Sequence, residues 1–178
     1  IKKHLSDKVN DWAASVDDIT VATAIKEGTI ITGGALVSLL TGEEVNDYDV
    51  YFRNKEALVT VAQYYVDKWN KEHNDDVFLE VDEEHKTSGS VKIYVQSSGV
   101  AESREDNEDD SKYVPIFLSS NAITLSNKVQ IVIRFYGEVE DIHKNYDFVH
   151  CTCSWTSWDN EVQLPAKALE CIINKELV

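Results

Sequence analysis

The chain has 178 residues, and 17 basic against 32 acidic side chains give a formal net charge of −15. Its 43% hydrophobic content is that of an ordinary globular protein, which excludes wholesale disorder, and we expect residues 1–178 to form a single domain. The acidic balance excludes a broad nucleic-acid-binding surface, which needs a basic patch. No apolar run approaches the ~20 residues that span a bilayer, so we expect no membrane contact.

The first residue of the chain and its cysteine content lead to expectations about processing and cellular compartment. It begins at Ile1 and contains no methionine, which predicts a core fragment or processed product of a longer protein. Three cysteines are too few for a disulfide framework, and no export signal opens the chain. We therefore expect free thiols in a reducing cytoplasm.

The first half of the chain alternates helices with short strands. Apolar residues at helical spacing predict one helix or two short ones over residues 5–27, ended by Gly28. There follow a buried strand at 29–32, a short helix at 35–41 ended by Gly42, and a strand at 47–52. Asn54 is placed to cap a long helix over 55–72.

The second half is richer in β-branched and aromatic residues. Strands are predicted at 77–81, 90–96, 122–125, 129–136 and 146–155, with a short helix at 138–144 and a final helix that opens at Pro165. This element order predicts an α/β (α+β) domain, with a mixed twisted sheet flanked by helices.

Residues 101–112 differ in composition from the rest, because they carry six acidic side chains: Glu102, Glu105, Asp106, Glu108, Asp109 and Asp110. A run of like charges is typical of a solvated loop that repels itself. The alternative is that residues 102–110 form a docking surface for a basic protein partner.

One segment carries residues suited to phosphate chemistry. Asp47 and Asp49 alternate along a strand, so both carboxylates point to one face, and Mg²⁺ binds one or two carboxylates together with substrate phosphates. Two such ions can stabilise the attacking and leaving oxygens of an in-line displacement. Gly33 and Gly34 precede a helix and let a triphosphate approach the backbone and the helix N-terminus.

The strand, glycine pair, helix and Asp47-Tyr48-Asp49-Val50 together resemble the nucleotidyltransferase superfamily of DNA polymerase β, poly(A) polymerases and CCA-adding enzymes. Residues 120–135 and 145–151 are similar to phage-encoded nucleotidyltransferase-like proteins. The resemblance implies a nucleotidyltransferase-like fold, with Asp47, Asp49 and Asp147 binding Mg²⁺ (or Mn²⁺) and Gly33-Gly34 holding the triphosphate of an NTP. The acceptor stays open among RNA, protein and small molecules.

Other chemistry-bearing residues favour structural roles. Cys151, Cys153 and His150 lack a second pair of zinc ligands and are expected to pack in the core. The cations nearest the carboxylates by sequence are Arg53, Lys55, Lys128, Arg134 and Lys144. Of these, Lys144 is the candidate for nucleotide binding, because it precedes Asp147 by three residues. Trp155 and Trp158 are expected to pack rather than to stack on a base.

Two functions follow from these patterns. The first is a metal-dependent nucleotidyltransferase that moves a nucleoside monophosphate from an NTP to an acceptor hydroxyl and releases pyrophosphate. The alternative is a catalytically inactive fold of the same kind that serves as a phage structural or host-interaction protein through its acidic surface. A phage protein of either kind is expected to work in the cytoplasm of a host cell.

Overall fold

The structure is a computed structural model that describes residues 1–82, 90–94, 100–102, 112–133, 136 and 153–163. Its helices are α1 (Lys2–Ala14), α2 (Ile19–Gly28), α3 (Gly34–Thr41) and α4 (Lys55–His73). Its strands are β1 (Thr29–Thr32), β2 (Tyr48–Phe52), β3 (Phe78–Asp82), β4 (Ser90–Tyr94), β5 (Val100–Glu102), β6 (Pro115–Ser119), β7 (Ala122–Leu125), β8 (Val129–Val132), β9 (Ser154–Thr156) and β10 (Glu161–Gln163).

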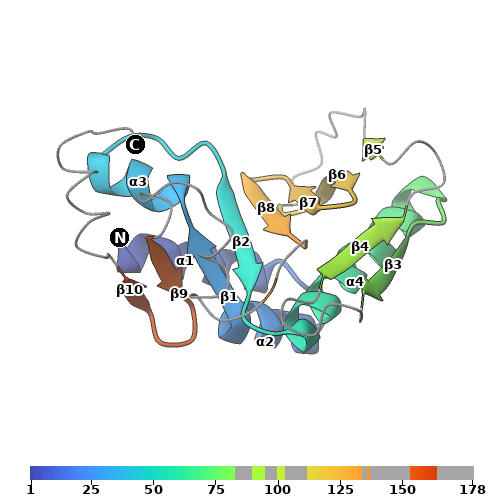
Figure 1. The fold of residues 1–178 in the computed structure, drawn as a ribbon, viewed down its shortest axis with the longest axis horizontal. Helices are drawn as coiled ribbons and strands as arrows, with labels where there is room; N and C mark the ends of the chain where they lie inside the picture. Colours follow the sequence, from blue (N-terminus) through green and yellow to red (C-terminus); the bar gives the residue numbers. More distant parts are fainter. Residues whose placement is uncertain (83–89, 95–99, 103–111, 134–135, 137–152, 164–178) are drawn as a thin grey trace.

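A mixed sheet organises the described chain (Figure 1). Its eight strands run in the order β10-β9-β1-β2-β8-β7-β6-β5, while β3 and β4 form a separate antiparallel pair. Within the sheet, β2 and β8 pair in parallel, and β1 pairs antiparallel with both β2 and β9. The predicted mixed α+β architecture is therefore confirmed.

One face of this sheet packs against α1, α2 and α4. Alternate residues of the strands enter a common core with apolar residues of the three helices: Leu5, Val9, Trp12, Val21, Ile25, Ile31, Val50, Phe52, Leu58, Val61, Tyr65, Ile123, Ile131 and Trp155. The Trp12 indole donates a 2.7 Å hydrogen bond to the Tyr65 hydroxyl, which satisfies two buried polar groups where α1 meets α4. The opposite face carries a much smaller apolar cluster around Ile30 and Tyr51.

The N-terminal helical region consists of two helices, because Asp18 starts a second one. Its carboxylate accepts hydrogen bonds from the backbone N–H groups of Thr20 and Val21, so α2 begins afresh at Ile19. Gly28 is the last residue of α2 and does not adopt the left-handed conformation of a glycine cap. A Cβ at Gly28 would lie 3.1 Å from the Cβ of Ala57, which is a tight contact, so the glycine favours the close approach of α2 and α4.

Several strands differ from the sequence prediction. The expected strand at 129–136 ends at Val132, and the expected strand at 146–155 is described only from Ser154 to Thr156. Three strands are additional to those predicted: β5, β6 and β10. Ala101 and Glu102 belong to β5, so the prediction of an acidic loop is wrong for these two residues. Residues 103–111 lie outside the described residues.

The remaining predictions in the C-terminal half have mixed outcomes. The expected helices at 138–144 and after Pro165 lie outside the described residues, as do His150, Cys151 and Cys171. Cys153 is fully buried in the main core, which confirms its expected packing role. Among the described helices, none is both long and apolar enough to cross a membrane.

Candidate functional site

The turn from β1 into α3 is formed by Gly33 and Gly34. Gly33 has φ 70° and ψ −134°, a conformation that is essentially restricted to glycine. A Cβ added at Gly33 or at Gly34 would have no neighbouring atom within 4 Å. Within the described chain no side chain caps α3, whose first N–H groups follow this turn. Gly34 is exposed and Gly33 is buried, and the role of this turn in holding a triphosphate stays a prediction.

The acidic pair lies beside this turn because of the register between β1 and β2. Asp49 pairs with Thr32, the last residue of β1, and Asp47 comes directly before β2. Asp49 is half-buried and Asp47 is exposed. Burial raises the pKa of the Asp49 carboxyl, and the charge of Asp47 raises it further. The pair therefore crowds negative charge next to the glycine turn, where a cation would offset it.

A row of polar side chains extends from Asp49 across the sheet. Residues paired on neighbouring strands present their side chains on the same face, and Ser154, Thr32, Asp49 and Gln130 are paired in this order on β9, β1, β2 and β8. The Ser154 hydroxyl is buried and has no hydrogen-bond partner among the residues that the structure describes. The sequence analysis missed this row, because it depends on which distant strands pair and in which register.

Lys128 fixes the segment that leads into the acidic pair. Its ammonium group donates hydrogen bonds of 3.0 Å to Glu44 Oε1 and to the carbonyl oxygen of Val45, and its own carbonyl accepts from Tyr48 N–H at 2.7 Å. Asn127 and Lys128 both adopt positive φ in the turn between β7 and β8. Lys128 thus holds the backbone before Asp47 and is engaged with Glu44.

Three other candidates from the sequence are not covered by the described part of the chain. Asp147, Lys144 and Arg134 are outside the described residues. Among the residues that the structure does describe, no group of three His, Cys, Asp or Glu side chains is arranged to hold a metal ion. The structure therefore brings together Gly33, Gly34, Asp47 and Asp49.

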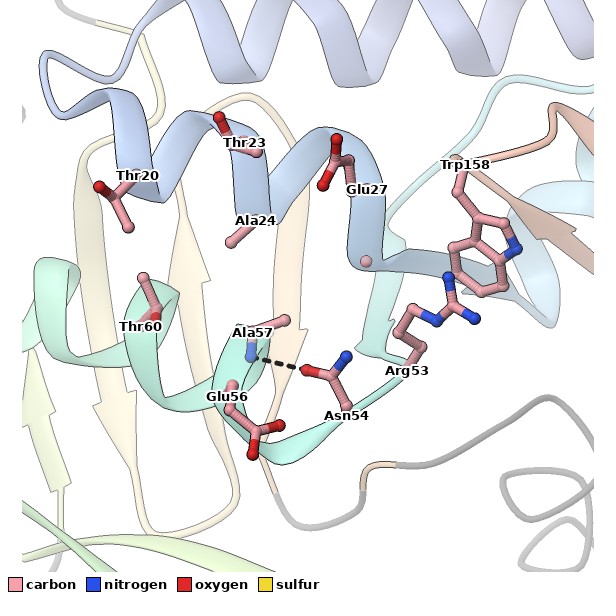
Figure 2. Close-up of a pocket in the computed structure, with 11 residues that line it drawn as sticks. Thr20, Thr23, Ala24, Glu27, Arg53, Asn54, Glu56, Ala57, Thr60 and Trp158 are labelled. Carbon is pink, nitrogen blue, oxygen red and sulfur yellow. Dashed lines mark hydrogen bonds between the residues drawn. The ribbon is translucent and has the colours of Figure 1, made fainter.

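A pocket of about 670 Å³ lies at the opposite end of β2, between α2 and the start of α4 (Figure 2). Arg53, which borders it, is four residues beyond Asp49, or ~13 Å along an extended strand. Its guanidinium lies 4.1 Å from the centre of the Trp158 ring, so Trp158 stacks on a cation. Asn54 Oδ1 accepts a 2.8 Å hydrogen bond from Ala57 N–H and caps α4, as predicted. This pocket and the acidic pair are separate features.

Comparison with known proteins gives one family match. The model of the Gabija anti-defense 2 family (Gad2) matches residues 3–175, and no nucleotidyltransferase family matches. The comparisons with curated proteins and with solved structures found no match. The assignment to the nucleotidyltransferase superfamily is therefore wrong. The glycine turn and the Asp-x-Asp strand that suggested it are short patterns, which recur outside any one family.

Proposed function

Because the chain belongs to the Gabija anti-defense 2 family, a phage anti-defence family, we propose that it counteracts the Gabija defence inside the host cell by binding one of its components. The family match over residues 3–175 is the observation that carries this proposal. The physical means of binding is the acidic surface of the protein.

The acidic side chains of the described chain lie almost entirely at the surface. Exposed carboxylates lie on α1, α2 and α4, before α2 and β2, and at or just before β10: Asp7, Asp11, Asp17, Asp18, Glu27, Glu43, Glu44, Glu56, Asp67, Glu72, Asp159 and Glu161. With 17 basic against 32 acidic side chains, 15 negative charges have no basic counterpart within the chain. Such a field attracts a positively charged protein surface and speeds the encounter with it.

The partner proposed is accordingly a basic surface of a Gabija component. The acidic run at 102–110, of which Glu102 is the last residue of β5, extends the same negative charge. Nucleic acid is a poor partner for this surface, since its phosphates would be repelled.

The test is a plating experiment. Bacteria that carry Gabija, and are infected with a phage that Gabija blocks, should regain plaque formation when they express this chain. Cells without Gabija, with and without the chain, provide the control for toxicity. Plaque formation that stays blocked while the soluble chain accumulates would contradict the proposal.

A second candidate function is metal-dependent nucleotidyl transfer at Gly33, Gly34, Asp47 and Asp49. The observation that favours it is the position of Asp49 beside the turn into α3, where Gly34 is exposed; burial and the charge of Asp47 raise the pKa of the Asp49 carboxyl, and a bound divalent cation would offset this crowded charge. A bound Mg²⁺ or Mn²⁺ would supply charge stabilisation for phosphoryl transfer. Asp47 and Asp49 would hold the ion, and the turn would hold phosphate oxygens through its backbone N–H groups.

The two candidates are separated by one double variant. Asp47→Asn with Asp49→Asn keeps the size of both side chains and removes both charges of the pair. If the chain acts by binding, this variant should still restore plaques. If it acts by nucleotidyl transfer, the variant should lose the effect, and the wild-type protein alone should release pyrophosphate from an NTP with Mg²⁺ or Mn²⁺.

A further inference from the structure

The pocket between α2 and α4 has a floor of small residues. Ala24 and Ala57 lie along the groove where the two helices meet, with Thr20, Thr23 and Thr60 beside them (Figure 2). Gly28 also lines the pocket. The short contact that a Cβ at Gly28 would make with Ala57 shows how closely the helices approach beneath the groove. The result is a shallow apolar track on which the aliphatic part of a side chain can lie.

Three polar side chains on α2 and α4 offer hydrogen-bond acceptors to the pocket: Thr23, Glu27 and Glu56. The Thr23 hydroxyl donates its hydrogen to the carbonyl oxygen of Ile19 at 2.8 Å, so its lone pairs remain as acceptors. Glu27 on α2 and Glu56 on α4 are exposed carboxylates on the two helices that border the groove (Figure 2). These groups suit a ligand that brings N–H donors.

The charge of the pocket favours a cation as ligand. The lining contains two carboxylates, those of Glu27 and Glu56, and one guanidinium, that of Arg53. The Arg53 guanidinium is stacked on the Trp158 ring. Asn54 already caps the first turn of α4, and Glu56 places a negative charge in that turn, so the helix N-terminus is a poor site for an anion. The net charge of −15 adds to the repulsion of anions.

We propose that this pocket binds a short basic segment of a host protein and that a lysine or arginine side chain of that segment lies in the groove. The apolar stem contacts Ala24, Gly28 and Ala57, and the charged end reaches Glu27 or Glu56. The volume of about 670 Å³ lies within the ~300–1,000 Å³ of ligand pockets, which accommodates more than one side chain. The inference rests on the proposed host interaction and locates that interaction at the pocket between α2 and α4.

The first experiment measures binding on the purified chain. The probe is a blocked pentapeptide, Ala-Ala-Arg-Ala-Ala, and its analogues carry citrulline or glutamate in place of arginine. The arginine peptide should shift the NMR amide signals of Thr23, Ala24 and Ala57 and bind about tenfold more tightly than the citrulline peptide. Equal or tighter binding of the glutamate peptide, or no shift at these residues, would overturn the inference.

Two matched double variants test the role of charge. Glu27→Gln with Glu56→Gln removes two charges at the pocket, whereas Glu72→Gln with Glu80→Gln removes two exposed charges elsewhere. The Glu27/Glu56 variant should bind the arginine peptide about tenfold more weakly than the wild type, and the Glu72/Glu80 variant less than about twofold more weakly. Thr23→Arg, at an exposed helix position, should block the groove without unfolding the chain, which circular dichroism checks. Equal weakening by both pairs would overturn the inference in favour of a general charge effect.

The plating experiment then separates the pocket from the proposed function. If the wild type restores plaques and the Glu27/Glu56 variant does not, the pocket carries the host contact. If both restore plaques equally, the pocket inference fails while the proposed function stands. If the wild type restores none, the proposed function fails and so does the host role of the pocket, even where the peptide binds.

Discussion

The two ends of β2 have opposite kinds of local structure. At its start, Asp47 and Asp49 crowd negative charge beside a glycine turn in a strained conformation. At its end, Arg53 stacks on Trp158, and Asn54 caps α4. The contacts at the end of β2 therefore stabilise the fold, whereas the crowded charge at the start of β2 opposes folding locally.

Strain and uncompensated charge gather where a protein meets a ligand, because the ligand can relieve them. The start of β2 is thus the place to test nucleotide chemistry, and the pocket at its end is the place to test protein recognition. Variants at the two ends should differ in how they affect stability.

Among these variants, a substitution at Gly33 is expected to change the stability of the fold most. Its φ of 70° and ψ of −134° are strained for any residue with a Cβ, so Gly33→Ala should lower the free energy of unfolding by about 1–3 kcal/mol. Urea denaturation followed by circular dichroism measures this change. A loss below ~0.5 kcal/mol would show that the turn does not hold this conformation in solution.

The second largest change in stability is expected at the other end of β2, where Asn54 caps α4. Asn54→Ala removes the hydrogen bond to Ala57 N–H and should cost about 1 kcal/mol, whereas Asn54→Asp keeps an acceptor and should cost little. The same denaturation experiment compares the two variants. Similar losses for both would mean that capping is not the source of the stability.

Gly34→Ala is expected to have a smaller effect of opposite sign. Gly34 is the first residue of α3, its φ is not positive, and a Cβ there meets no atom within 4 Å. Alanine should therefore raise the free energy of unfolding by about 0.4–1 kcal/mol. If the open turn holds phosphate, the stabilised variant should lose pyrophosphate release; unchanged release would argue against a ligand at this turn.

The smallest effect is a pH-dependent gain on replacing Asp49. Its pKa is raised above the ordinary value of 3.8 by burial and by Asp47, so the folded state holds the proton more tightly and ionised Asp49 opposes folding. Asp49→Asn should therefore raise Tm at pH 7, and this gain should shrink as the pH falls and vanish below the ordinary value. Thermal melts between pH 3 and pH 7 measure it. A gain that persists at pH 3 would point to another cause.

Much of the fold follows from the sequence because its signals are local. The apolar spacing of α4, the cap at Asn54 and the stop at Gly42 each depend on residues within one or two helical turns. The strands β5, β6 and β10 were missed because three to five residues carry little periodicity.

The site was predictable only in part for a related reason. The glycine turn and the acidic pair lie close in the sequence, and the strand register then places Asp49 opposite Thr32. The polar row through Ser154 and Gln130 depends on pairing between distant strands, and the pocket joins α2, the start of α4 and Trp158. Such long-range contacts leave no spacing signal in the sequence.

The central claim is a charge-dependent contact between this chain and a component of Gabija, and binding between purified proteins tests it most directly. Each purified Gabija component is mixed with the chain at low and at high salt, and complex formation is followed by size-exclusion chromatography. The account predicts a complex at low salt that weakens as salt rises, because screening reduces attraction between exposed charges. The absence of any complex at low salt, with all proteins folded, would contradict it.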